Sequence, residues 1–395
     1  MSDWPRIPLG DIFEIARGGS PRPIDAYITD ADDGINWISI ADASDSSKYI
    51  ERTKRRIRPE GATRSRAVVP GDLLLTNSMS FGRPYIMRTT GCIHDGWLVL
   101  AKKREGIDQD FFYRLLGSDA IYAAFAQLAA GATVKNLNID LVKGVSVPVP
   151  TLPEQRRIAA ILDQADALRA KRREALAQLE SLTQSIFIEM FGDPATNPHH
   201  WPVGRIADLL ESASYGTSEK SASSGEVPVL RMNNLTRSGE LDLRDLKYME
   251  LPESLRSRYL VRGGDVLFNR TNSADLVGKT AMVPQGLPPL AYAGYLIRLR
   301  VNSASSPTYL SRFLNTGYAK LMLRGMCKSI IGMANINATE IQAMKIAVPP
   351  LALQQTFATR FQAVESLKAT HRAALAELDA LFASLQHRAF AGQLS

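Results

Sequence analysis

The sequence predicts an α+β protein in which two pseudo-repeated α/β domains alternate with two long helices that form an antiparallel coiled coil. Two observations predict this fold: an internal repeat that runs through the whole chain, and a heptad pattern of apolar residues after each copy of the mixed segment. The 395 residues suit two or three domains better than one. We expect domains at residues 1–150 and 201–349, long helices at 151–193 and 350–395, and a linker at 194–200.

The internal repeat consists of six matches that occur in the same order in both halves. The strings recur 192–199 residues later, so the spacing drifts by only a few residues. The pairs are Trp4-Pro5 and Trp201-Pro202, Lys48-Tyr49 and Lys247-Tyr248, Arg64-Ser65-Arg66 and Arg256-Ser257-Arg258, Gly71-Asp72 and Gly264-Asp265, Asn136-x-Asn138 and Asn335-x-Asn337, and Val149-Pro150-x-Leu152-x-x-Gln155 and Val348-Pro349-x-Leu351-x-x-Gln354. Six ordered matches indicate a duplicated unit of domain and helix.

Each domain combines short apolar runs typical of buried strands with amphipathic stretches typical of helices. The expected strands are 73–75, 97–100 and 145–149, with 266–268 and 296–299 in the second domain. The expected helices are 111–116 and 120–128, which correspond to 309–314 and 318–323. Gly and Pro between these runs favour turns, so each domain is expected to be an α+β unit.

The long helix after the first domain has clear start and stop signals. Thr151 supplies a capping hydroxyl, Pro153 stands in the first turn, and Glu154 favours the helix N-terminus. Gly192 suits the C-terminal cap, and Pro194 cannot continue a helix. A helix between these signals is about 57 Å long at 1.5 Å per residue.

Apolar residues recur along both helices with the heptad spacing of a coiled coil. Arg172 and His371 interrupt the seam at equivalent positions of the repeat, which favours packing of the two helices against each other. The alternative is that each helix packs on its own domain. The predicted seam and partner residues are Ile158, Ile161, Leu162, Leu168, Arg172, Leu179 and Ile186 on the first helix and Phe357, Phe361, Val364, His371, Leu375, Leu378 and Phe382 on the second.

The formal net charge of +7 favours a polyanionic partner such as nucleic acid. Cations cluster between residues 48 and 66, where they could neutralise phosphates, although a solvated surface is the alternative interpretation. The candidates for phosphate contact are Lys48, Lys54, Arg55, Arg56, Arg58 and, in the second domain, Lys247. The candidates for base reading are Asn77, Arg83 and Asn136 in the first domain and Asn233, Asn234, Arg270, Asn272 and Lys279 in the second, although each could instead cap a turn.

The motifs expected of an enzyme or a metal protein are missing from the sequence. The two Pro-Pro pairs lack the flanks with which an adenine methyltransferase holds its base, and no Gly-x-Gly-x-x-Gly loop is present. Gly278-Lys279-Thr280 resembles the end of a phosphate-binding loop, but Ser273 replaces its first glycine. Cys92 and His94 have no second pair at zinc spacing, and His199-His200 lies in the linker.

Two further features concern the compartment. Cys92 and Cys327 are the only cysteines, so a disulfide scaffold is excluded. No apolar run reaches the roughly 18 residues that a membrane helix needs, and the first residues do not resemble a signal peptide. These features predict a cytoplasmic protein with no membrane contact.

The order of domain, helix, domain and helix resembles the specificity subunits of type I restriction–modification systems over essentially the whole chain. The strings that carry the resemblance are Pro-Gly-Asp-Leu-Leu-Leu at 70–75, Gly-Gly-Asp-Val-Leu-Phe at 263–268, Leu-Pro-Glu-Gln-Arg-Arg-Ile at 152–158 and Met-Phe-Gly-Asp-Pro at 190–194. The second helix departs from the pattern, because Leu-Ala-Leu-Gln-Gln at 351–355 lacks the Pro-Glu of the first.

The resemblance implies that the two domains are target-recognition domains, each reading one half of a split double-stranded DNA site. It implies that the helices dock two copies of a modification subunit, which binds S-adenosylmethionine and methylates adenine N6. A restriction subunit that uses ATP and Mg would complete the assembly. The chain itself would be non-catalytic and would bind no cofactor. Because the two domains have diverged, we expect the DNA site to be bipartite and asymmetric.

Three other functions fit part of the sequence. A stand-alone DNA-binding regulator would share the two basic domains, but it would need no helix surface for other subunits. Apolar residues outside the mutual seam, with Ile158, Leu162 and Leu176 as examples, favour a partner-bound bundle instead. A specificity component of a fused restriction–methylation enzyme would leave the role of this chain nearly unchanged. A structural spacer would need no DNA contact at all.

Overall fold

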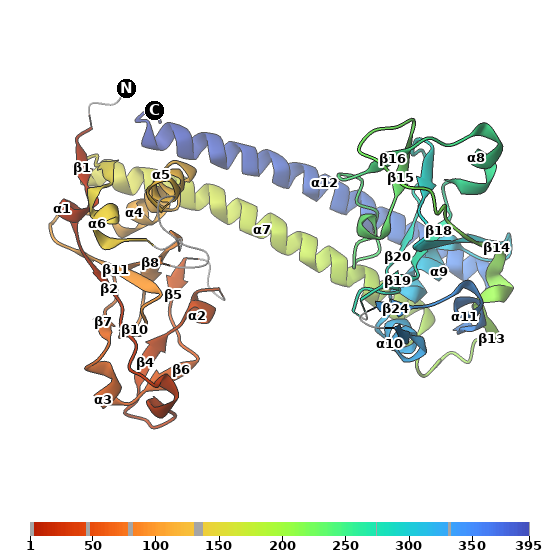
Figure 1. Ribbon diagram of the computed structural model, residues 1–395, viewed down its shortest axis with the longest axis horizontal. Helices are drawn as coiled ribbons and strands as arrows, with labels where there is room; N and C mark the ends of the chain where they lie inside the picture. The colour runs from red at the N-terminus through yellow and green to blue at the C-terminus, as the bar shows by residue number, and fades with distance from the viewer. Residues whose placement is uncertain are drawn as a thin grey trace. The chain divides into compact units, whose positions relative to one another are not determined.

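The computed structural model describes residues 4–44, 48–77, 82–129, 137–273, 275–330 and 333–394, and Figure 1 labels many of its elements. The chain forms two compact units. The first unit contains Met1–Lys171 and Leu375–Ser395, and the second contains Arg172–Ala374. Each unit therefore holds one domain, the half-helix that follows it, and the far half of the other long helix.

The domain of the first unit is built on two five-stranded sheets. The inner sheet has the order β2 (Phe13–Arg17), β11 (Trp97–Lys102), β8 (Leu73–Thr76), β9 (Pro84–Met87) and β5 (Tyr49–Ile50). The outer sheet has the order β3 (Ile28–Thr29), β6 (Arg55–Ile57), β4 (Ile35–Ile38), β10 (Gly91–Ile93) and β7 (Arg66–Val68). A separate pair joins β1 (Arg6–Pro8) to β12 (Ser146–Pro148).

Short helices connect these strands. They are α1 (Leu9–Ile12), the 3-10 turn η1 (Ile24–Ala26), α2 (Ile40–Ser44), α3 (Pro59–Ala62), α4 (Gln109–Leu116), α5 (Asp119–Ala129) and α6 (Ile139–Gly144). Of these, α1, α4, α5 and α6 contribute buried residues to the core of the inner sheet. Phe111 and Phe112 of α4 are fully buried against Leu98 and Leu100 of β11, in a core that also includes Ile158 of the long helix α7 (Leu152–Phe191). The domain and its helix therefore share one hydrophobic core.

The second domain repeats this plan with smaller sheets. One sheet has the order β14 (Leu210–Tyr215), β22 (Leu296–Val301), β18 (Val266–Asn269) and β20 (Thr280–Met282), and another has β16 (Lys247–Met249), β15 (Val227–Leu230), β21 (Leu290–Tyr292) and β17 (Leu260–Val261). A third contains β19 (Thr271–Asn272), β24 (Met333–Asn335) and β23 (Lys328–Ile330), and β13 (Val203–Arg205) pairs with β25 (Lys345–Ala347). The helices are η2 (Ile206–Leu209), η3 (Met232–Asn234), α8 (Glu253–Tyr259), α9 (Pro307–Leu314), α10 (Gly317–Met326), α11 (Ala338–Ala343) and the long α12 (Leu351–Phe390).

The predicted internal repeat is confirmed by the topology of the two domains. The order β2-β11-β8-β9 in the first corresponds to β14-β22-β18-β20 in the second, and each domain has one matching parallel pair, β4 with β10 and β15 with β21. The turns after β2 and β14 repeat as well. A Cβ atom on Gly18 would lie 2.0 Å from the His94 carbonyl oxygen, and one on Gly216 would lie 2.3 Å from that of Ala293. Only glycine allows this close approach.

In each unit the two long-helix segments lie side by side and run in opposite directions. The contacts are Arg157–Leu394 and Arg169–Asp379 in the first unit, and Arg172–His371, Glu180–Lys368 and Glu189–Arg360 in the second. Residue numbers rise on one segment as they fall on the other, which defines the antiparallel direction. α7 ends at Phe191, where Gly192 takes the predicted left-handed conformation with φ +80°.

The buried face of α7 differs from the predicted seam. Leu168 of the predicted seam is 49% exposed, whereas Ile158 and Leu162, expected to face a partner, are fully buried in the core of the first unit. The reason is that α7 packs on its own domain as well as on α12. The buried stripe is therefore displaced from the one that helix–helix packing alone would give. Ile161, Leu176, Leu179 and Ile186 are half-buried.

The predicted positions on α12 face inward. Phe357, Phe361 and Val364 are buried, and His371, Leu375, Leu378 and Phe382 are half-buried. In the second unit Phe357 packs edge-on against Phe187 and Phe191 of α7, with ring centroids 5.6 and 5.2 Å apart. Aromatic contacts therefore join the two helix segments within this unit.

Candidate functional site

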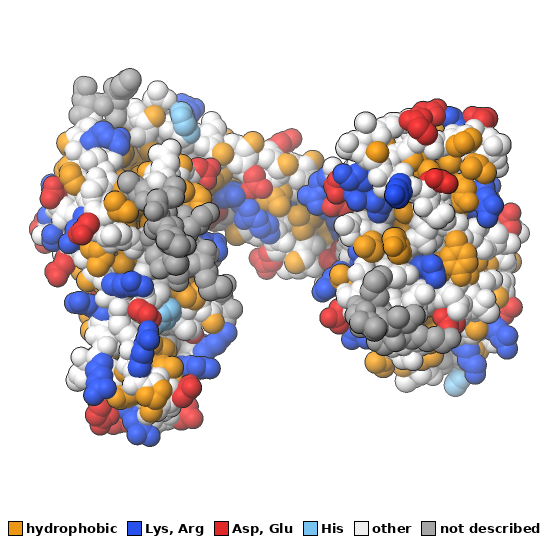
Figure 2. All heavy atoms as spheres, viewed as in Figure 1, with side chains coloured by type: hydrophobic (Ala, Val, Ile, Leu, Met, Phe, Trp, Pro, Cys, Tyr) orange, Lys and Arg blue, Asp and Glu red, His pale blue; other side chains and the backbone are white. Residues whose placement is uncertain are grey.

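The predicted cationic stretch of the first domain lies mainly on its outer sheet. The exposed cations of β6 and the residues beside it are Lys54, Arg55, Arg56 and Arg58. Ile57 of the same strand is fully buried with Trp37 and Cys92, which anchors the strand. Figure 2 shows Lys and Arg side chains spread over the surface of this domain, with several acids among them. The strand therefore holds its exposed cations on a segment that is anchored in the core of the outer sheet.

Lys48 belongs to the same stretch but is only 8% exposed. Its Nζ lies 2.8 Å from Asp110 Oδ1 and 2.6 Å from Asp163 Oδ2. Burial disfavours the charged form of Lys48, but hydrogen bonds to the two carboxylates outweigh burial and raise its pKa. The side chain is bound inside the first unit, which corrects the expectation that it contacts a phosphate.

The predicted base-reading residues of the first domain have different surroundings. Asn77 is fully buried, and its side-chain Nδ2 donates to the Asp95 carbonyl at 3.4 Å. It therefore serves the fold, which corrects its assignment as a base reader. Arg83 is exposed and stays a candidate. Asn136 lies outside the described residues.

Two predicted residues of the second domain are also structural. Asn234 is 2% exposed, and its amide donates to two carbonyls of residues 242–245 at 2.8 and 2.9 Å. Lys279 Nζ donates to the carbonyls of Met232 and Leu235 at 2.7 and 2.6 Å, and burial lowers the pKa of this lysine. Both side chains stabilise the segment after β15, which corrects their assignment as base readers.

The other candidates of the second domain reach its surface. Asn233 is exposed, and Lys247, Arg270 and Asn272 are half-buried. The Arg270 guanidinium lies 4.9 Å from the centre of the Tyr215 ring, a cation–π contact that holds it over the end of β14. These four residues stay candidates for DNA contact.

Arg172 and His371, the predicted polar pair of the seam, contact each other. Arg172 Nη1 lies 3.1 Å from His371 Nδ1. An arginine guanidinium has no acceptor atom, so the histidine nitrogen is the acceptor in this bond. This assigns the proton of neutral His371 to Nε2.

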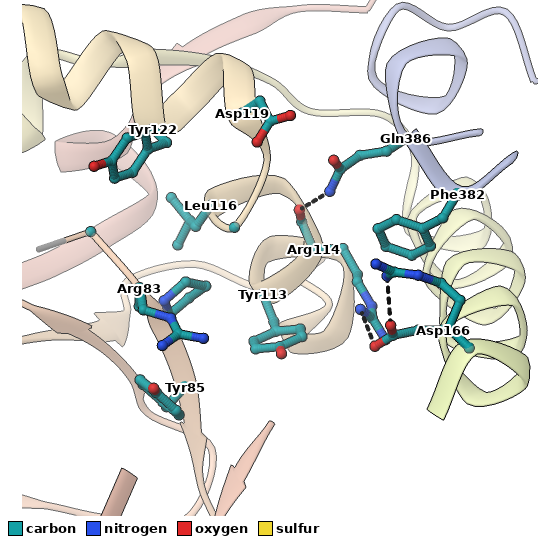
Figure 3. Close-up of a pocket in the computed structure, with 14 residues that line it drawn as sticks. Arg83, Tyr85, Tyr113, Arg114, Leu116, Asp119, Tyr122, Asp166, Phe382 and Gln386 are labelled. Atoms are coloured by element: carbon teal, nitrogen blue, oxygen red, sulfur yellow. Dashed lines mark hydrogen bonds and ion pairs between the residues drawn. The ribbon is translucent and has the colours of Figure 1, made fainter. Parts of the chain in front are cut away.

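The first domain is fixed to α7 by a chain of ion pairs. Arg114 of α4 is 8% exposed, and its Nε and Nη1 lie 2.7 Å from Asp163 and 2.9 Å from Asp166 of α7. Arg169 then joins Asp166 at 2.9 Å to Asp379 of α12 at 2.6 Å. Figure 3 shows Arg114 and Asp166 pointing toward each other beside Phe382. At this junction the domain supplies two cations, Lys48 and Arg114, and α7 supplies the carboxylates that bind them.

The second domain is fixed to α12 by the opposite arrangement. Lys368 of α12 is 1% exposed and lies 2.7 Å from Glu240 of the domain, 2.9 Å from Glu365 and 2.5 Å from Glu180 of α7. Arg372 Nη2 lies 2.8 Å from each oxygen of Glu240. Burial alone would raise the pKa of Glu240, but the bonds from Arg372 and Lys368 outweigh burial and lower it. Here the domain supplies the carboxylate and the helix supplies the cations.

A buried glutamine stands at the same place in both junctions. Gln155 is fully buried; it accepts from the Asp108 amide at 2.9 Å and donates to the carbonyls of Gly106 and Pro150 at 3.0 and 2.9 Å. Gln354 accepts in the same way from the backbone amide before α9 at 2.9 Å and donates to the carbonyl five residues before it at 2.8 Å. Each glutamine ties the start of a long helix to the start of α4 or α9.

Each unit has a pocket beside its junction. The pocket of the first unit is about 470 Å³ and is lined in part by Arg114, Gly117, Phe382 and Gln386 (Figure 3). The pocket of the second is about 330 Å³, and the repeat-equivalent residues Arg312, Asn315, Thr183 and Phe187 line it. The duplication therefore extends to surface concavities between the domain and the helix segments.

The junction residues were missed by the sequence reasoning. Gln155 and Gln354 carried a signal, because both belong to a matching string of the repeat. Asp163 and Glu240 carried none, since each is an ordinary acid among others until the fold brings cations to it.

Two further properties concern the described part of the chain. None of its helices combines the length and the apolar composition that crossing a bilayer requires. Its histidine, cysteine and acidic side chains form no group of three or more that could hold a metal ion.

Relatives of known type match this chain over most of its length. A family model described as the type I restriction modification DNA specificity domain matches residues 1–181 and 198–380. The EcoKI specificity subunit of Escherichia coli K12 is 26% identical over 289 residues, which cover 68% of this chain and 62% of the relative. The MjaIX specificity subunit of Methanocaldococcus jannaschii is 22% identical, with 90% of this chain and 85% of the relative covered. The StySPI specificity subunit of Salmonella potsdam is also matched over only 62% of its length.

Solved structures show the same fold. A chain from a study of the assembly and conformational transition of a type I restriction–modification system has a TM-score of 0.60 and 20% identity, with 99% of this chain and 98% of that chain covered. The S subunit of the type I system from M. genitalium has a TM-score of 0.58 and 15% identity, with coverage of 98% and 96%. Since the family model matches both halves, this chain belongs to the family of type I restriction–modification DNA specificity proteins.

Proposed function

We propose that this chain is a non-catalytic specificity subunit that reads a bipartite, asymmetric double-stranded DNA site, one half with each domain. The observation that carries the proposal is the duplicated domain–helix unit with diverged surfaces. Two copies of one fold suit two half-sites, and different surface side chains suit two different base sequences. The contact residues of the proposal are Lys54, Arg55, Arg56, Arg58 and Arg83 of the first domain and Asn233, Lys247, Arg270 and Asn272 of the second.

The proposal includes docking of two copies of a modification subunit, one on the paired antiparallel segments of α7 and α12 in each unit, as in a coiled coil. Each unit carries an exposed leucine on each of its helix segments. Leu168 and Leu381 of the first unit are 49% and 50% exposed, and Leu182 and Leu367 of the second are 43% and 51% exposed. The four occupy equivalent positions of the repeat, so each unit offers the same apolar pair. Two equivalent surfaces favour two copies of one partner.

S-adenosylmethionine would be bound by the modification subunit, and ATP with Mg by a restriction subunit that joins the complex. The direct test is sequencing of adenine methylation in the host genome with and without this gene. We expect loss of one split, asymmetric methylated motif on deletion. A methylome that stays unchanged while the modification subunit is present and active would contradict the proposal.

The docking surface has its own test. Replacing Leu168 and Leu381 by Glu should abolish capture of one modification subunit and leave the unfolding temperature within a few degrees of the parent, because exposed apolar residues contribute little to folding. The matched control replaces Leu182 and Leu367, which should remove the other copy. Native mass spectrometry of the co-expressed complex counts the copies. Retention of both copies in both variants would show that these leucines do not form the docking surface, whereas an unaltered chain that captures no modification subunit would favour the stand-alone DNA-binding regulator.

A further inference from the structure

Four positions of the two long helices carry the same sign of charge at equivalent places of the repeat. The pairs are Asp166 and Glu365, Arg169 and Lys368, Arg173 and Arg372, and Glu180 and Asp379. The central cation makes the same contacts in both units. Arg169 binds Asp166 three residues before it and Asp379 of α12, and Lys368 binds Glu365 three residues before it and Glu180 of α7.

A nearby position that binds the first domain differs in charge between the helices. Asp163 of α7 corresponds to Gln362 of α12. The Asp163 carboxylate binds both cations of the first domain, with Lys48 Nζ at 2.6 Å from Oδ2 and Arg114 Nε at 2.7 Å from Oδ1. Both cations are 8% exposed. A neutral amide at this position could not neutralise two buried cations.

The second domain does not need an acid at this position. Its equivalent of Arg114 is Arg312 of α9, which donates to the carbonyls of Ser238 and Gly239 at 3.0 and 2.8 Å. The Nε of Arg312 is buried without a partner, whereas the Nε of Arg114 binds Asp163. The second domain contacts its helix through Glu240 instead, and Glu240 needs only the two cations of α12.

We propose that Asp163 is the positioning residue that restricts the first domain to α7. The second domain is compatible with either helix, because α7 has Arg169 and Arg173 where α12 has Lys368 and Arg372. The first domain is compatible with α7 alone. On α12 its Lys48 and Arg114 would meet Gln362 and share fewer carboxylates while still buried, which is strongly unfavourable. The two domains are therefore exchangeable in one direction only.

Two full-length chimeras test this asymmetry. In the first, the first domain replaces residues 201–349, and we expect its unfolding midpoint to fall by roughly 5–15 °C. Adding Gln362→Asp should restore most of that loss, whereas Gln362→Asn, which adds no charge, should restore none. In the second chimera, the second domain replaces residues 1–150, and its midpoint should stay within a few degrees of the parent.

The unaltered chain supplies a test that does not depend on chimeras. Asp163→Asn should lower the midpoint and speed hydrogen exchange at α4, and Asp163→Glu should recover part of both. A normal midpoint and normal exchange for Asp163→Asn would overturn the proposal. So would a first chimera that is as stable as the parent or that gains nothing from Gln362→Asp. If neither chimera folds, the unfolding midpoints and exchange rates of the Asp163 variants decide whether the proposal holds. The unfolding midpoints and exchange rates are all measured without DNA, so these results do not depend on whether the proposed function is correct.

Discussion

Ion pairs hold the domain to its long helix in both units, but the signs of the charges are reversed between the two junctions. In the first unit the domain brings Lys48 and Arg114 to the acids of α7, and in the second unit Glu240 comes to the cations of α12. The buried glutamine beneath each junction is the same residue type at the same position. The two units therefore share the buried glutamine that binds the backbone. They differ in the ion pairs around it, because the domain supplies the cations in the first unit and the carboxylate in the second.

The largest expected effect tests whether the second junction depends on its single buried cation. Lys368→Met leaves Glu180, Glu240 and Glu365 without their shared partner, and should lower the free energy of unfolding by about 3–5 kcal/mol. Chemical denaturation measures the loss. The matched control is Arg360→Met, since the Arg360–Glu189 pair is exposed and should contribute less than about 1 kcal/mol. Equal effects would mean that burial of Lys368 is unimportant.

The glutamine anchors should behave alike in the two halves. Gln155→Ala and Gln354→Ala each leave buried backbone groups unpaired, so each should cost about 2–3 kcal/mol of unfolding free energy. Denaturation of the two variants gives the comparison. A large difference between them would break the view that this part of the junction is common to both units.

Acid should weaken the second junction through Glu240. The pKa of Glu240 is lower in the folded protein than the usual 4.5, so the folded state binds fewer protons than the unfolded chain and loses stability as the pH falls through that range. Glu240→Gln should cost about 1.5 kcal/mol at neutral pH and flatten the pH dependence below about pH 5. Unfolding midpoints between pH 7 and pH 4, roughly the range of carboxylate titration, test this. If Glu240→Gln leaves the pH dependence of the unfolding midpoint unchanged, protonation of Glu240 does not cause the loss of stability in acid.

The smallest expected effect concerns DNA rather than stability. Arg55→Ala and Arg58→Ala should each weaken binding to any duplex and reduce the slope of log K against log salt by about 0.9. Fluorescence anisotropy across a salt series measures the slope. Lys48→Ala makes the contrasting variant, because a buried lysine should change the unfolding midpoint and leave the slope unaltered. A reduced slope for Lys48→Ala would return that residue to the contact surface.

The sequence was sufficient for the repeat, the α+β character and both long helices, because these depend on patterns that extend over many residues. Leu73–Leu75 and Trp97–Leu100 lie within strands as expected, and α7 ends at Phe191 as its glycine signal predicts. The phase of the buried face on α7 was wrong for Leu168, because leucines lie on both sides of the helix and only the domain core selects between them. Lys48 and Asn77 were misassigned since a side chain's type does not reveal its burial.

The contact between Arg172 and His371 has a consequence for the origin of the chain as a single polypeptide. The two residues are equivalent in the repeat, yet they lie opposite each other. Two identical half-chains would place the same side chain at both positions: either two arginines, which have no acceptor between them, or two histidines, which could pair only by adopting different tautomers. Joining the halves allows a donor to face an acceptor. A covalent fusion thus permits at this point a complementary pair that perfect symmetry forbids.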